Sequence, residues 1–245
     1  MRDTALIFRR QLSMSLRSPL WMVVGLVQPV VYLVFFGPLL AGLNLGANSW
    51  QVYIPGLLVQ LALFGAAFVG FSVIADVRSG VIERMRVTPV SRVALLLGRV
   101  LRDVVLLVAQ TVVLLVVAVG FGLRAPLGGV LLSLVLIALL TTSLAALSYT
   151  FGMATKSEES LAPLLNTVTV PLLLLSGILL PMSLAPGWLD VLSRFTPLRY
   201  IVDAIRDAFL GHYATTTTLT GLLVAVGLAA VAIAWGSRVF RRDNA

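Results

Sequence analysis

The sequence predicts an all-α polytopic membrane protein with six transmembrane helices. Its 245 residues are 59% hydrophobic and only 11% charged, with a mean hydropathy of +1.03. An ordinary soluble domain carries about 25% charged residues, so a soluble fold of this composition would expose apolar patches large enough to cause aggregation. The apolar stretches do not alternate with polar residues, which excludes a transmembrane β-barrel.

Six apolar stretches are long enough to cross the hydrocarbon core of a bilayer, which takes about 20 residues of helix. They cover approximately residues 20–40, 54–75, 104–123, 128–154, 161–181 and 219–238. We therefore treat residues 1–245 as a single transmembrane domain.

The N-terminal segment, residues 1–19, predicts an amphipathic helix that lies on the membrane surface. Ala5, Phe8, Leu12 and Leu16 recur at helical spacing, and the basic residues of the segment lie mostly on other faces. A frayed tail is the alternative interpretation.

Basic residues gather in the segments that would share one side of the membrane. Most of the 18 Lys and Arg residues lie before the first span, between the second and third, or after the sixth. The positive-inside rule places these segments and both termini in the cytoplasm. The net charge of +8 suits anionic lipid headgroups or the acidic face of a cytoplasmic protein, and we expect no nucleic-acid partner.

Residues that could carry out chemistry are scarce. The chain has no cysteine and one histidine, His212, so we expect no disulfide, no metal site and no cysteine nucleophile. The spans carry no titratable residue well inside the hydrocarbon, which argues against proton-driven transport. The nearest approach to a phosphate-binding loop, around Lys156, lacks the second glycine. We expect no catalytic residue and no cofactor in this chain, so energy would have to come from another polypeptide.

The basic segment between the second and third spans predicts a docking element. Residues 80–85 can form a short helix, Pro89 ends it, and a new helix is expected from about Arg92. Apolar side chains beside charges of both signs suit a groove on a partner protein, and a solvated linker is the alternative. Arg99 and Arg102 are expected at headgroup level, with their stems in lipid.

Residues 182–212, between the fifth and sixth spans, predict two short extracellular helices. Apolar residues recur at helical spacing in both. Arg199, Asp203 and Arg206 lie on the polar face of the second helix at pairing distance, and Gly211 is expected to cap it. We expect these helices to re-enter the outer membrane face; two surface helices without a role in transport are the alternative.

Two long stretches resemble a known family. The stretch DVRSGVIERMRVTPVSRVALLLGRVLRD, residues 76–103, resembles the first cytoplasmic loop of ATP-binding-cassette type-2 membrane subunits. The stretch PLLLLSGILLPMSLAPGWLDVLSRFTPLRYIVDAIRDAFLG, residues 171–211, is similar to the C-terminal signature of that family. The resemblance covers the whole chain in order and is closest to the daunorubicin-resistance type of exporter permease.

The resemblance implies an exporter in the bacterial plasma membrane. Two permease subunits, identical or paralogous, would sit on two separate ATPase subunits that bind ATP and Mg²⁺. Residues 76–92 would form the coupling loop that docks on the ATPase, beside the N-terminal helix. The coupling residues that match the motif are Asp76, Arg78, Gly80, Glu83, Arg84, Arg86, Thr88, Pro89 and Arg92.

The same resemblance makes residues 182–212 a gate above the substrate path. The expected gate residues are Pro181, Pro186, Trp188, Pro197, Tyr200, Asp203 and Arg206. The second and fifth spans are expected to line a path with few hydrogen-bonding groups, which suits an amphipathic drug or lipid. The expected path residues are Gln60, Phe64, Phe68, Asn166 and Thr169. Two alternatives stay open: export of a polysaccharide or cell-envelope glycolipid, and a non-transporting membrane scaffold.

Overall fold

The computed structural model describes residues 2–17, 20–41, 49–80, 92–179 and 181–242, which form helices joined by short turns and include no β-strand. The all-helical fold class is thus confirmed over these ranges. The long helices are α2 (Leu20–Ala41), α3 (Ser49–Ala67), α6 (Arg92–Gly120), α7 (Leu127–Thr155), α8 (Glu158–Leu175) and α11 (Thr216–Arg242). The shorter elements are α1 (Arg2–Leu16), α4 (Gly70–Arg78), the 3-10 turn η1 (Met182–Leu184), α9 (Gly187–Ser193) and α10 (Pro197–Phe209).

Four stretches of helix are long and apolar enough to cross a membrane. They are Ser49–Arg78, Val93–Gly120, Leu127–Thr155 and Thr216–Phe240. A shorter apolar stretch, Val23–Gly37, lies within α2. These helices make the chain a multi-pass membrane protein, whereas membrane spans for α2 and α8 stay predictions.

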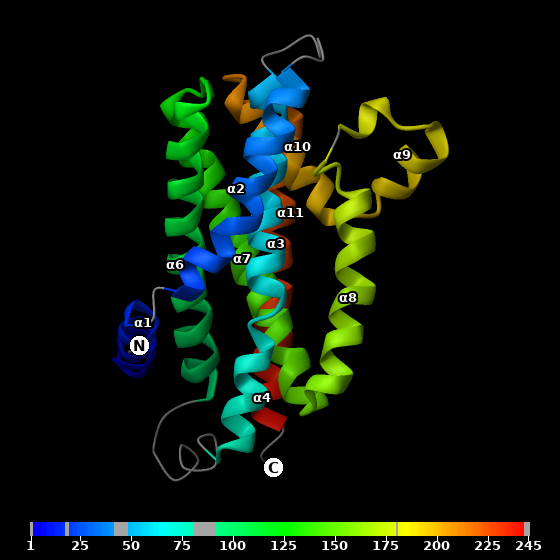
Figure 1. Cartoon of the computed structure of the whole chain (residues 1–245). Coiled ribbons are helices and arrows are strands. Elements are labelled where there is room, and N and C mark those ends of the chain that lie inside the picture. Colours follow the sequence, from blue (N-terminus) through cyan, green and yellow to red (C-terminus); the bar gives the residue numbers. More distant parts are fainter. Residues whose placement is uncertain (1, 18–19, 42–48, 81–91, 180, 243–245) are drawn as a thin grey trace.

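Helix α7 lies at the centre of the bundle, where it packs against α3, α4, α6, α10 and α11. Figure 1 shows the long helices side by side, with α8 standing apart from them on the side that leads to α9. The core contains fully buried aliphatic and aromatic side chains, among them Leu57, Leu58, Leu136, Leu140 and Tyr149.

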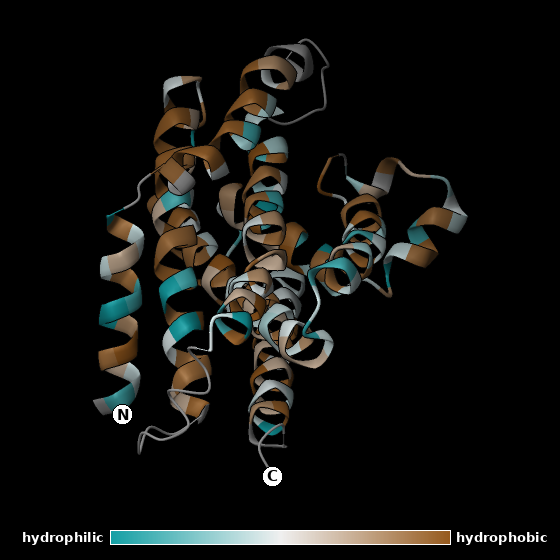
Figure 2. Ribbon diagram, turned by 60° about the horizontal axis from the view of Figure 1, so that its bottom comes forward, coloured by the Kyte–Doolittle hydropathy of each residue, from teal (hydrophilic) through white to brown (hydrophobic). Residues whose placement is uncertain are grey.

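The outer surface of the bundle is also apolar. Figure 2 shows hydrophobic residues on outward-facing turns as well as between the helices. Val116 and Val119 of α6 and Leu131 of α7 are each more than half exposed. Such a surface would be unfavourable in water and is typical of helices that face lipid.

Helix α1 crosses the long helices instead of running with them. Figure 1 shows α1 end-on while α6 and α7 run up the page, and Figure 2 shows it lengthwise. It packs on α6 at Gly98, where a Cβ atom would lie 2.7 Å from Cγ2 of Ile7. The missing side chain at Gly98 therefore lets the two helices approach closely. The predicted N-terminal helix is confirmed, and its place at a membrane surface stays a prediction.

The second expected span is not one continuous helix, because α3 and α4 are separated by a break at residues 68–69. The hydroxyl of Ser148, on α7, is inserted there. It accepts a hydrogen bond from the backbone N–H of Gly70 at 2.9 Å and donates one to the carbonyl of Ala67. A side chain inserted into the backbone ladder is a known cause of a sharp helix bend. We call residues 67–70 with Ser148 the α3–α4 break.

The fifth expected span, residues 161–181, is too long at its C-terminal end. Helix α8 ends at Leu175, and Gly177 then adopts a left-handed backbone with φ of 72°. The turn packs onto α3 at Gly56, where a Cβ atom would collide with the carbonyl oxygen of Ile178. A left-handed glycine turn ends a helix, so the helical part of this span is shorter than hydropathy alone indicates.

Candidate functional site

An ion pair joins the helices on either side of residues 81–91. Nη2 of Arg99, on α6, lies 2.6 Å from Oδ2 of Asp76, on α4. The side chain of Arg99 is 5% exposed and that of Asp76 is 31% exposed. Water screens such a pair weakly, so it holds the end of α4 against α6. We call the end of the bundle where α4 ends and α6 begins the loop end.

A second buried cluster lies one turn further along α6. Nη2 of Arg102 pairs with Oδ1 of Asp103 at 2.8 Å, and the hydroxyl of Tyr149 donates to Oδ2 of Asp103 at 2.5 Å. Nη1 of Arg102 also donates to Oγ of Ser15 at 3.1 Å. Charged groups removed from water need such partners. The cluster therefore connects α1, α6 and α7 near the loop end.

Burial of Arg99 and Arg102 differs from the expectation that their stems lie in lipid at headgroup level. Arg99 is buried, and Arg102 is mostly covered and donates to Ser15 of α1 and Tyr149 of α7. The sequence offers one sign of this: Asp103 follows Arg99 by four residues and directly precedes the apolar run 104–123, where an unpaired carboxylate would be costly. Tyr149, the partner of Asp103, and Ser15, the partner of Arg102, carry no recognisable signal in the sequence.

The described coupling residues lie at the loop end. Asp76 is paired with Arg99, and Nη1 of Arg78 forms an exposed ion pair of 3.2 Å with Glu158 at the start of α8. Gly80 has φ of 68°, a left-handed conformation that few other residues adopt readily. Arg92 begins α6, and its side chain lies outside the described part of the chain. Also outside it are Glu83, Arg84, Arg86, Thr88 and Pro89.

At the opposite end of the bundle, Arg206 of α10 joins three segments. Its Nε donates to the carbonyl of Val52 at 3.0 Å, its Nη2 to the carbonyl of Gly177 at 2.6 Å, and its Nη1 to Oδ1 of Asp203 at 3.2 Å. The expected Asp203–Arg206 pairing is present, but Arg206 is buried rather than surface-exposed. Arg206 therefore fixes α3, α10 and the turn after α8 together.

A cavity of about 320 Å³ lies beside this arginine. Of the expected gate residues, Pro181, Asp203 and Arg206 line it. Pro197 begins α10, and the hydroxyl of Tyr200 donates to the carbonyl of Arg194 at 2.9 Å. Pro186, the residue before α9, and Trp188 in its first turn are exposed and do not line this cavity. The structure thus brings three of the seven gate residues together around the cavity.

Burial and ion pairing shift the pKa values of the ionisable groups at this end in different directions. Burial raises the pKa of Asp203 and lowers the pKa of Arg206, and the mutual attraction of the two charges opposes both shifts. Hydrogen bonds from Arg194 and Arg199 lower the pKa of Asp190. Asp190 therefore remains ionised at neutral pH and ties α9 to α10 through Arg199, whose Nη2 lies 2.6 Å from its Oδ1.

The expected path residues lie in different surroundings. Thr169 of α8 lines a small cavity of about 90 Å³ between α3, α7 and α8, whereas Asn166 is exposed on another face of α8. Gln60 is buried in α3, and its Oε1 has no hydrogen-bond partner among the described residues. Phe64 is half-buried, and Phe68 stacks on Phe71 with ring centroids 6.1 Å apart.

These features define a class of protein: a helical multi-pass membrane protein with buried ionic clusters near one end and no recognisable catalytic centre among the described residues. Residues 2–210 match the family model of the ABC-2 type transporter, so the chain belongs to the ABC-2 type transporter family.

Named relatives agree with this assignment. The chain is 26% identical over 231 residues to a daunorubicin resistance ABC transporter permease of Streptomyces coeruleorubidus, covering 93% of this chain and 82% of the relative. It is 24% identical over 227 residues to a protein of Mycobacterium tuberculosis named as a doxorubicin resistance ABC transporter permease, covering 91% and 82%. It is 27% identical over 197 residues to a protein of Cyanophora paradoxa named as a transport permease, covering 78% and 68%.

Proposed function

We propose that this chain is the permease subunit of an ATP-driven exporter that moves an amphipathic drug or lipid out of the cell. The observation that carries the proposal is the match of residues 2–210 to a transporter family, together with drug-resistance permeases that align with over 90% of the chain. The membrane subunit itself hydrolyses nothing. Two separate ATPase subunits bind ATP and Mg²⁺, and a second permease subunit, identical or paralogous, completes the path.

Force enters at residues 76–92. The ATPase subunits dock on this segment, and their closure on ATP displaces it. Because Asp76 and Arg99 pair at 2.6 Å, the displacement moves α4 and α6 together instead of being absorbed between them. The neighbouring cluster of Arg102, Asp103 and Tyr149 passes the movement to α7.

The α3–α4 break supplies the pivot. Ser148 satisfies the backbone groups on both sides of the break, so α4 can change direction without leaving buried N–H and C=O groups unpaired. Backbones of α4 and α7 touch at this point, because a Cβ atom on Gly152 would lie 2.6 Å from the carbonyl oxygen of Gly70. Helix α4 then acts as a short lever between the docked ATPase and α3.

The orientation completes the mechanism. Both termini and residues 76–92 face the cytoplasm of a bacterial cell, and the six spans include α2 and α8. Residues 182–212 re-enter the outer face and close the path from outside. Arg206 holds this gate shut by binding α3 and the turn after α8, so opening requires its hydrogen bonds to break or move.

Reconstitution tests the proposal. The chain should co-purify with an ABC ATPase when the two are coexpressed, and the complex in proteoliposomes should move daunorubicin or a fluorescent phospholipid only when ATP is supplied. Stimulation of ATP hydrolysis by a polysaccharide or glycolipid, and not by the drug or phospholipid, would change the cargo class. A chain that never associates with an ATPase would support a scaffold instead.

A further inference from the structure

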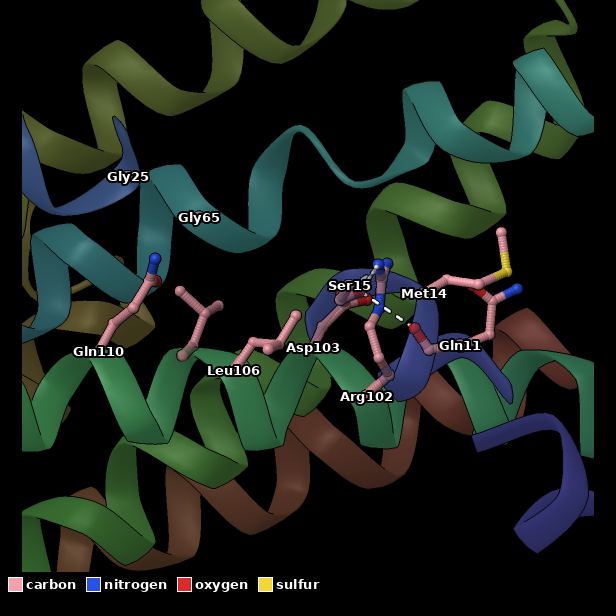
Figure 3. A pocket seen from close by; sticks show the side chains of 10 residues that line it. Gln11, Met14, Ser15, Gly25, Gly65, Arg102, Asp103, Leu106 and Gln110 are labelled. Atoms are coloured by element: carbon pink, nitrogen blue, oxygen red, sulfur yellow. Dashed lines mark hydrogen bonds and ion pairs between the residues drawn. The ribbon is translucent and has the colours of Figure 1, made fainter. Parts of the chain in front are cut away.

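A cavity of about 450 Å³ lies near the loop end between α1, α2, α3 and α6, apart from the expected path. Its volume is within the range of small-molecule sites, about 300–1,000 Å³. Figure 3 shows Gln11, Met14 and Ser15 of α1 at one end and Gln110 of α6 at the other. The long axis of the cavity therefore follows α6.

The end next to α1 is polar and contains Arg102, whose Nη1 makes one hydrogen bond among the described residues and so keeps one N–H for an occupant. A guanidinium has five N–H donors, and Arg102 directs three hydrogen bonds or ion-pair contacts to Ser15, Tyr149 and Asp103. Its Nε is buried and has no acceptor in the described part of the chain, so the donor that can face an occupant is on Nη1. The negative charge of Asp103 is balanced by Arg102, and its two oxygens accept from Arg102 and Tyr149. The donors at this end are Arg102 and the side-chain amide of Gln11.

The rest of the cavity is apolar and reaches the lipid-facing surface. Leu106 and Leu107 line it, together with the backbone of Gly25 and Gly65, which are both exposed. The far end is closed by Gln110, since a Cβ atom on Gly25 would lie 2.9 Å from its Nε2. A fitting occupant has an acceptor-rich head beside α1 and an aliphatic tail along α6.

The outer surface around the cavity favours a lipid over a soluble molecule. Leu20 and Val24 on α2 are exposed apolar side chains close in sequence to Gly25, which lines the cavity. Helix α1 also carries the exposed residues Arg9 and Arg10, whose positive charges suit anionic lipid headgroups. A phosphate group has several charged acceptor oxygens, which form strong hydrogen bonds with arginine.

We propose that this cavity binds a membrane phospholipid, with the phosphate at Arg102 and one acyl chain along Leu106 and Leu107. The proposal uses the membrane orientation given above but does not depend on ATP-driven transport. The bound lipid would fill the space between α1 and α6 and hold α1 in place beside the ionic clusters.

Lipid binding can be measured on the full chain purified in detergent with the subunits that accompany it. We expect phosphatidylglycerol to raise the thermal unfolding midpoint and to remain bound in native mass spectrometry. Diacylglycerol with the same chains and free glycerol phosphate at the same concentration should do neither. An equal shift with diacylglycerol would contradict the role of the phosphate, and an equal shift with glycerol phosphate would contradict the role of the chain.

Two variants, one on α1 and one on α6, change residues that line the cavity, and each has a control on the same helix. Gln11→Glu places a negative charge beside the phosphate, and Ser13→Glu makes the same change on an exposed position of α1 outside the cavity. Leu106→Trp fills the apolar part, and Val105→Trp adds the same bulk on the exposed face of α6. Gln11→Glu and Leu106→Trp should weaken phosphatidylglycerol binding about tenfold, a free-energy change of about 1.4 kcal/mol.

The controls should bind the lipid like the unmodified chain. Unchanged binding in both Gln11→Glu and Leu106→Trp would overturn the proposal, and so would equal loss in all four variants. Unfolding midpoints without added lipid and gel-filtration profiles identify a variant that has lost its fold, and the variant in the other wall then decides the result.

Discussion

Nη2 of Arg99 lies 2.6 Å from Oδ2 of Asp76, although 23 residues separate the two in sequence. The pair closes the base of the segment that contains residues 81–91, because Asp76 is near the end of α4 and Arg99 is two turns into α6. A load on that segment therefore reaches both helices. This relationship gives the proposed coupling mechanism its first test.

Substituting Arg99 by Gln should destabilise the protein and uncouple it. The change leaves the partly buried carboxylate of Asp76 without its cation, which we expect to cost about 1–3 kcal/mol of unfolding free energy. Transport should fall more than ATP hydrolysis, because the ATPase still docks but its movement is no longer transmitted from α4 to α6. Unfolding midpoints and the ratio of transport to hydrolysis in proteoliposomes measure the two effects.

Arg78→Gln is the matched control for stability, since it removes an exposed ion pair from α4, the helix that carries Asp76. Its cost should be no more than about 1 kcal/mol. Equal losses of unfolding free energy in the Arg99 and Arg78 variants would show that burial of the Asp76–Arg99 pair does not matter.

Substituting Gly152 by Ala should disturb the α3–α4 break. The new Cβ atom would lie 2.6 Å from the carbonyl oxygen of Gly70, so α4 must shift away from α7. Overpacking of this kind costs about 1–3 kcal/mol, and transport should become less tightly coupled to ATP hydrolysis. Thermal unfolding and the transport-to-hydrolysis ratio are the measurements.

Gly227→Ala provides the comparison on α11, where nothing lies within 4 Å of the added methyl group. Removing a glycine from a helix interior should stabilise the protein by about 0.5–1 kcal/mol. If Gly152→Ala also stabilised the protein and left coupling intact, the break would not be the pivot.

Substituting Arg206 by Gln should loosen the outer gate. The carbonyls of Val52 and Gly177 and the carboxylate of Asp203 lose their donor, at a cost of about 3 kcal/mol. The chain contains no cysteine, so a single Gln51→Cys probe in the outer cavity can be labelled by a membrane-impermeant maleimide. Labelling from outside should be faster in the Arg206→Gln background.

Arg194→Gln tests whether any lost arginine has this effect. Arg194 is 63% exposed and its partner Asp190 also pairs with Arg199, so the cost should be at most about 1 kcal/mol. Labelling rates that are equal in the two backgrounds would contradict a gate held by Arg206.

Substituting Glu83 by Lys should abolish transport while expression and membrane insertion stay intact. Glu83 lies in the segment expected to dock on the ATPase, and a reversed charge there opposes association. Glu159→Lys reverses an exposed charge at the start of α8 and should transport normally. Full transport by the Glu83 variant with the ATPase present would count against docking at this segment.

Hydropathy predicted much of the fold because helix length and apolar composition are local properties. The start of α6 at Arg92, the helices after Pro186 and Pro197, and the glycine cap of α10 all followed from local signals; Gly211 has φ of 85°. The α3–α4 break was not predictable from local sequence, because Ser148, whose hydroxyl occupies it, lies 78 residues from Gly70.

The buried charges near the loop end illustrate the same limit. Asp76 was selected from its motif, but its partner Arg99 was expected at headgroup level, since local sequence does not say which helices will cover it. The burial of Asp103 depends on Tyr149, which is 46 residues away. Pairing over such separations is a property of helix packing and only a structure reveals it.

The central claim is that the chain cannot drive transport alone and receives force through residues 76–92. The most direct test is uphill daunorubicin movement in proteoliposomes. Three preparations are compared: the unmodified chain alone, the unmodified chain with its ATPase, and the Glu83→Lys chain with the ATPase. We predict ATP-dependent transport only for the unmodified complex. Uphill movement by the chain alone, in the absence of any nucleotide-hydrolysing subunit, would contradict the account.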